Sequence, residues 1–149
     1  MAYFDHHQYY KDDIPEIAHT EYRVTSEETT AYNCIAWALE IPDQWIDPTP
    51  DYIWHEEVER GYTVAVFMEL FTRWGRYESC DNGSLEEGYQ KIAIYHDGFN
   101  QFHHVARQLA SGKWTSKLGS NEDIEHELSG LEGKFYGYAK IFMKRPVSV

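Results

Sequence analysis

Two segments of the chain carry residue types that could act together as a thiol catalyst. Cys34 lies at the expected start of a helix, and His104 lies in the segment 102–109, whose composition predicts a strand. A helix N-terminus and a nearby imidazolium both favour a thiolate, which is the attacking nucleophile in thiol enzymes. The pair therefore predicts a nucleophile, Cys34, and a base, His104.

The choice of His104 over its neighbour His103 follows from strand geometry. Successive side chains of a strand point to opposite faces, so only one of the two histidines can face the Cys34 helix. If Phe102 packs inward, His104 shares its face with Ala106, whose small side chain leaves room for a helix to approach. We therefore expect the Cys34 sulfur and the His104 ring to lie within hydrogen-bond reach.

A catalytic histidine needs a third group that orients its ring and fixes its tautomer. The next expected strand supplies Ser116 and, as an alternative, Thr115, while Asp123 could supply a carboxylate instead. We select Ser116 for this role. The oxyanion would be stabilised by the backbone N–H of Cys34 together with Asn33.

Other kinds of chemistry find weaker support in the sequence. A metal site could be drawn from His103, His104, His126 and a cysteine, but no Cys-x-x-Cys or His-x-x-x-His spacing is present. The chain has neither a Gly-rich phosphate loop nor a Gly-x-Ser-x-Gly nucleophile elbow. No metal and no cofactor is therefore predicted.

The expected helices lie in the first half of the chain. Asn33 and two threonines before it are alternative N-caps for the Cys34 helix, which Pro42 must stop. Residues 42–60 contain three prolines and predict a long ordered loop. Apolar residues then recur with helical spacing and predict a second helix at 64–75, ended by a glycine.

The second half of the chain changes to strand-like periodicity. A short helical piece is expected at 121–128, and residues 76–88 form a polar connection. Four strands joined by turns are expected at 91–96, 101–109, 113–118 and 135–143. The expected fold class is α+β, with N-terminal helices packed on a C-terminal antiparallel sheet of about four strands.

Length and charge limit the classes of protein that the chain can belong to. Its 149 residues predict one domain, 1–149, with an irregular N-terminal segment at 1–28. The 25 acidic residues against 13 basic ones give a formal charge of −12, which argues against nucleic acid or an anionic membrane as a partner. The sequence predicts no membrane span and no signal peptide. Cys34 and Cys80 are then expected as reduced thiols in a cytoplasmic protein.

Several longer motifs resemble a family of uncharacterised bacterial proteins of unknown function. They are Asn-Cys-x-Ala-x-Ala-Leu at 33–39, Lys-Ile-Ala-x-Tyr at 91–95, His-x-Ala-Arg-Gln-Leu at 104–109 and Gly-Lys-Trp-Thr-Ser-Lys-Leu-Gly at 112–119. The resemblance covers roughly residues 30–145.

At one remove, the order of a helix Cys, a strand His and a polar residue on the next strand resembles papain-like cysteine peptidases and amidases. This resemblance implies that Cys34 attacks a carbonyl and that His104 shuttles the proton. The third residue of those enzymes is an Asn or Asp, whereas Ser116 or Thr115 stands here. In cell-wall amidases of this superfamily the histidine often opens the strand that here begins at Lys91, so His104 also matches their third position.

Two functions from different classes follow. The first is a papain-like cysteine hydrolase or acyltransferase that acts on an amide, peptide or isopeptide bond of a peptide or protein substrate. The second is a non-catalytic acidic interaction protein, such as an immunity or adaptor factor, on a degenerate papain-like fold. The hydrolase predicts that Cys34 alkylates faster than Cys80, whereas the charge and the 24 aromatic residues, 12 Tyr, 7 Phe and 5 Trp, favour the interaction protein.

Overall fold

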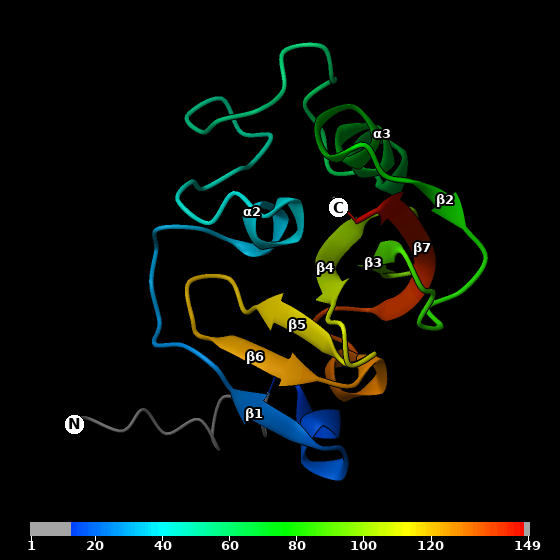
Figure 1. Cartoon of the computed structure of the whole chain (residues 1–149). Coiled ribbons are helices and arrows are strands. Elements are labelled where there is room, and N and C mark those ends of the chain that lie inside the picture. Colours follow the sequence, from blue (N-terminus) through cyan, green and yellow to red (C-terminus); the bar gives the residue numbers. More distant parts are fainter. Residues whose placement is uncertain (1–12, 148–149) are drawn as a thin grey trace.

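The structure, a computed structural model, describes residues 13–147, so the first twelve residues of the segment expected at 1–28 lie outside it. Its centre is an open antiparallel sheet of strand order β1-β6-β5-β4-β3-β7-β2 (Figure 1). The strands are β1 (Tyr22–Val24), β2 (Glu78–Cys80), β3 (Tyr89–His96), β4 (Phe102–Gln108), β5 (Trp114–Lys117), β6 (Asp123–His126) and β7 (Tyr138–Pro146). The helices are η1 (Pro15–His19), α2 (Cys34–Leu39), α3 (Val64–Gly75) and η2 (Leu128–Leu131), of which η1 and η2 are 3₁₀-helices.

The α+β class is confirmed, but the sheet has seven strands within residues 13–147 and not about four. The four expected strands correspond to β3, β4, β5 and β7. The three others are short: β1 and β2 have three residues each and β6 has four. So few residues cannot display a period of two, and their extended conformation comes from pairing with a neighbouring strand.

The prediction of a helical piece at 121–128 is wrong, because residues 123–126 form strand β6. This strand pairs with β1 on one side and with β5 on the other, so both of its edges find backbone partners. Ile124 is fully buried on one side, and Asp123 on the other accepts a hydrogen bond from Tyr32. Tertiary pairing therefore overrides a local pattern of acidic residues that resembles a helix start.

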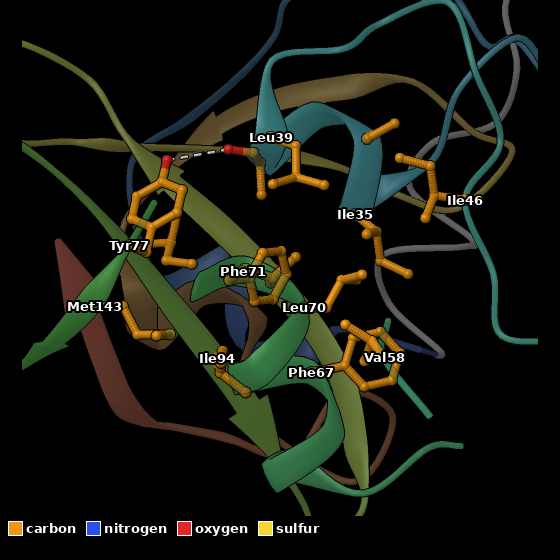
Figure 2. Close-up of a cluster of buried hydrophobic side chains, with 14 of the residues drawn as sticks. Ile35, Leu39, Ile46, Val58, Phe67, Leu70, Phe71, Tyr77, Ile94 and Met143 are labelled. Atoms are coloured by element: carbon orange, nitrogen blue, oxygen red, sulfur yellow. Dashed lines mark hydrogen bonds between the residues drawn. The ribbon is translucent and has the colours of Figure 1, made fainter. Parts of the chain in front are cut away.

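The two α-helices pack on the same face of the sheet. In α3 the Thr63 side chain caps the first turn by accepting a hydrogen bond from the Val66 N–H at 3.2 Å, which confirms the helix expected at 64–75. Figure 2 shows apolar side chains of both helices in one cluster with Ile94 of β3 and Met143 of β7. The Tyr77 hydroxyl adds a hydrogen bond to the Ala38 carbonyl, at 3.1 Å.

The sheet separates two hydrophobic cores, and β3 shows the division most clearly. Ile92 and Ile94 belong to the core under α2 and α3, whereas Ala93 and Tyr95 belong to the core on the opposite face. The second core also contains side chains from η1 and from the region of η2, including Ile17 and Leu131. Any side chain of the central strands can therefore be assigned to one face by the core that it contacts.

The loop between α2 and α3 is long and has little regular structure, as the prolines predicted, and it extends away from the sheet in Figure 1. Within residues 13–147, no helix has the length and apolar character needed to cross a membrane.

Candidate functional site

Cys34 is the first residue of α2, and its position is set by Asn33. The Asn33 side chain accepts a hydrogen bond from the Ala36 N–H at 3.2 Å, so Asn33 is the N-cap among the alternatives that the sequence left open. Its Nδ2 donates to the Ile46 carbonyl at 2.6 Å. This donor is thus already engaged with the loop that follows α2, while Asn33 holds the start of the helix in place.

Cys34 packs beside the neighbouring strands β4 and β5. β4 and β5 pair at Arg107–Thr115 and at Gln108–Trp114, and their pairing ends there. Helix α2 contacts both β4 and β5, and the backbone N–H of Val105 in β4 lowers the pKa of the Cys34 thiol. Cys34 also packs against the core under the helices.

Burial is the largest influence on the Cys34 thiol and raises its pKa to about 11. The N–H groups of Val105, Cys34 and Ile35 act in the opposite direction, as does the positive charge of Lys117, but they do not compensate. The thiol is therefore protonated at neutral pH. Cys34 is partly buried, and the desolvation of its sulfur outweighs the effect of the helix start on the thiol pKa.

Lys117 is an unusual neighbour of this helix because its side chain is fully buried. Its Nζ donates to the Thr29 carbonyl at 2.8 Å and to the Gly119 carbonyl at 2.5 Å. It also lies 5.2 Å from the centroid of the Tyr32 ring, whose hydroxyl donates to Asp123 Oδ2 at 2.7 Å. Burial lowers the pKa of Lys117, and the nearby Asp123 carboxylate opposes this shift. Together, Lys117 and the Tyr32–Asp123 hydrogen bond connect the segment before α2 to strands β5 and β6.

His104 lies on the opposite face of the sheet from Cys34. Its ring packs against Tyr95 at 5.5 Å and Tyr136 at 4.5 Å between centroids, and both tyrosines belong to the second core. Its neighbour Val105 belongs to the core under α2. Burial, assisted by repulsion from His126, lowers the pKa of His104 to about 3. The imidazole is therefore neutral, and its Nε2 is buried with no hydrogen-bond partner among residues 13–147.

A β-bulge explains why the sequence assigned His104 to the helix face. His104 pairs with Tyr95 and Phe102 pairs with His96, so the extra residue His103 interrupts the alternation of β4. Phe102 consequently packs against Phe67 of α3, with 3.7 Å between ring centroids. The expectation that Phe102 and His104 share a face fails for this reason.

Ser116 forms a hydrogen bond with His126 in the second core. Ser116 Oγ lies 2.7 Å from His126 Nε2, and His126 Nδ1 lies 2.8 Å from the Glu127 carbonyl oxygen. A carbonyl can only accept, so Nδ1 carries the proton and Ser116 donates to Nε2. Burial lowers the pKa of His126 to about 4. This serine–histidine pair is oriented as in a hydrolase, yet both side chains are completely buried.

The two alternative third residues are also engaged elsewhere. The Thr115 hydroxyl accepts a hydrogen bond from Trp37 Nε1 at 3.0 Å, on the α2 face. Asp123 accepts from Tyr32 through Oδ2, while its buried Oδ1 has no hydrogen-bond partner in the described part of the chain. The structure thus brings together Ser116 with His126 and Cys34 with Val105, but not Cys34 with His104.

Three surface cavities of about 560, 560 and 630 Å³ have other lining residues than Cys34, His104 and Ser116. Over residues 13–147, no group of three His, Cys, Asp or Glu side chains is placed to hold a metal ion. The Ser116–His126 contact was missed in the sequence because it joins strands β5 and β6, and β6 was expected to be helical.

Residues 23–144 match a family model described as a domain of unknown function, DUF7689. The chain belongs to this family. The match spans all seven strands except the first residue of β1 and the end of β7, and it includes α2, α3 and η2 but not η1. It also confirms the resemblance to an uncharacterised family. No curated protein and no solved structure matches the sequence.

Proposed function

We propose that this DUF7689 protein is a non-catalytic interaction protein that binds a basic protein partner. The observation that carries the proposal is the separation of Cys34 and His104 on opposite faces of the sheet. A thiol and a base that act together must share a proton, which requires hydrogen-bond contact or one intervening water. On this view the order of Cys, His and polar residue along the chain is papain-like in sequence only.

The charge of the protein supports the class of partner. A formal charge of −12 on 149 residues repels nucleic acid and anionic surfaces and attracts basic proteins over distances of about a Debye length. Acidic proteins gain mainly association rate and selectivity from such complementarity. An immunity or adaptor factor is the form of this function that we favour.

The cysteine hydrolase or acyltransferase remains a second candidate because of one feature. Three backbone N–H groups, from Cys34, Ile35 and Val105, lower the pKa of the Cys34 thiol and so favour negative charge at this position. Donors placed in this way could stabilise negative charge there or on a bound carbonyl oxygen. This papain-like mechanism needs His104 to reach the sulfur from the other face, or a different base in its place.

Alkylation of the two cysteines tests the proposal without a known substrate. At pH 7.5, a thiol of pKa about 11 is roughly one part in 3,000 thiolate. Iodoacetamide should therefore modify Cys34 at least about 100-fold more slowly in the native protein than in 8 M urea, as measured by mass spectrometry of the Cys34 peptide. Cys80, which lies in the short strand β2, should be modified faster than Cys34 in the native protein.

Native Cys34 that reacts faster than Cys80, or faster than in urea, would contradict the proposal and favour the hydrolase. Cys34→Ala, with Cys80→Ala as the matched control, extends the test to function. Ala is a good helix former, so the fold should persist. Retained binding of a basic partner by both variants is the expected result.

A further inference from the structure

The loop between α2 and α3 presents large apolar side chains to solvent. Three of them, together with one side chain from a neighbouring turn, have exposed fractions of 44% or more and form what we term the aromatic patch: Tyr52, Ile53, Tyr62 and Phe99. Phe99, which belongs to the turn between β3 and β4, is 84% exposed. Large apolar side chains gathered on a surface at this degree of exposure are a feature of protein-binding sites.

Backbone and side-chain contacts link the four residues into one region. The Tyr62 hydroxyl donates to Asp47 at 2.7 Å, and the Asp47 N–H donates to the Ile53 carbonyl at 3.2 Å, which connects Tyr62 with Tyr52 and Ile53. The Phe102 N–H donates to the Tyr62 carbonyl at 2.8 Å. This last bond holds the turn that carries Phe99 beside Tyr62.

Buried side chains and hydrogen bonds hold the loop between α2 and α3 in one conformation although it has little regular structure. Ile46 is completely buried and is held by Asn33, and the Trp54 indole donates to the Val58 carbonyl at 3.1 Å. Arg60 donates to the Thr49 carbonyl at 2.8 Å. A surface that is ordered before binding loses little conformational entropy on binding, so its apolar contacts contribute more fully to affinity.

The charge around the aromatic patch indicates what covers it. Residues 41–62 contain six acidic residues and one basic residue, Arg60. The acidic residues are Asp43, Asp47, Asp51, Glu56, Glu57 and Glu59. This segment of 22 residues therefore carries a formal charge of −5, whereas the other 127 residues carry −7. Aromatic rings within an acidic surface favour Arg and Lys side chains, through both charge pairing and cation–π contacts.

We propose that the aromatic patch is the docking surface for an Arg- or Lys-rich segment of a protein partner. The inference rests on the proposed function, since it names the surface through which a basic partner binds. The aromatic rings would contact the aliphatic stems and charged ends of the partner's side chains. The surrounding carboxylates would set the association rate and its dependence on salt.

A random twelve-residue peptide library displayed on phage provides the probe. Selection on the wild-type protein should enrich peptides in Arg and Lys relative to the starting library. The best synthetic peptide should then bind about tenfold or more weakly to the variant Tyr52→Ser/Phe99→Ser, as measured by fluorescence anisotropy. The matched control Leu85→Ser/Val24→Ser, which also removes two exposed apolar side chains, should bind within twofold of wild type.

A second pair of variants removes charge without touching the apolar surface. Asp43→Asn/Asp51→Asn should weaken binding and reduce its salt dependence, whereas Glu27→Gln/Glu28→Gln, at exposed positions on another segment, should have less effect. If enriched basic peptides bind Tyr52→Ser/Phe99→Ser and Asp43→Asn/Asp51→Asn as tightly as wild type, the docking surface is overturned and the proposed function stands. Selection that yields no binders, or binders without excess positive charge, would overturn the proposed function.

Discussion

Acid should destabilise this protein in a pH range where most of its carboxylates are still ionised, because two buried histidines cannot take up protons in the folded state. The pKa is about 3 for His104 and about 4 for His126, against an ordinary value of 6.5. Burial is the main cause for both. A histidine with a lowered pKa contributes stability that is fully present above 6.5 and is lost as the pH falls toward the folded value.

The size of the effect follows from proton counting. Between pH 7.5 and 5.5 each of these histidines takes up about 0.8 proton in the unfolded chain and almost none in the native one. The free energy of unfolding should therefore fall by about 3 kcal/mol for the two together, with a slope of roughly 2 to 3 kcal/mol per pH unit near pH 5.5. This result does not depend on the precise native pKa values as long as both lie below about 5.

Urea unfolding at half-unit pH intervals, followed by tryptophan fluorescence, measures this slope. His104→Phe should remove about half of the loss, since a Phe ring can occupy the space between Tyr95 and Tyr136 without titrating. The control His103→Gln changes a partly exposed neighbour that pairs with Asp97, and it should leave most of the slope unchanged. A stability that is flat from pH 7.5 to 5.5, or an unchanged slope in His104→Phe, would refute the argument.

Two further substitutions test how the fold is held, each by the free energy of unfolding in urea. Gly137→Ala should lower the free energy of unfolding by more than about 3 kcal/mol, because the residue has φ = 79° and the new Cβ would overlap the His96 carbonyl. The control Gly98→Ala, at φ = 87° with open space around it, should lower it by only about 1 kcal/mol. An equal loss of unfolding free energy in the two variants would show that the overlap at residue 137 is relieved without destabilising the fold. Asn33→Ala should cost about 2 to 3 kcal/mol because it removes the cap of α2 and the hydrogen bonds to Ile46. Thr63→Ala removes only a cap and should cost about 1 kcal/mol, so an equal loss in both would mean that the Ile46 contacts contribute little.

The sequence by itself determined the elements that local physics controls. The start of a helix near Cys34, the amphipathic helix at 64–75 and the longer strands were predictable, because capping and burial periodicity act over a few residues, although the choice of Asn33 over two threonines as the N-cap came from the structure. The charge that concentrates in residues 41–62 is likewise a property of the sequence alone.

Only the tertiary structure decided which side chains meet. The bulge at His103 puts the side chains of Phe102 and His104 on opposite faces of the sheet, and no local signal in the sequence marks it. Strand β6 exists because β1 and β5 flank it, and its pairing brings His126 to Ser116. The environment of Cys34 was set in the same way. The helix start favours a thiolate, but Cys34 packs against the core under the helices, and this burial determines its pKa because a charged thiolate there would lose hydration.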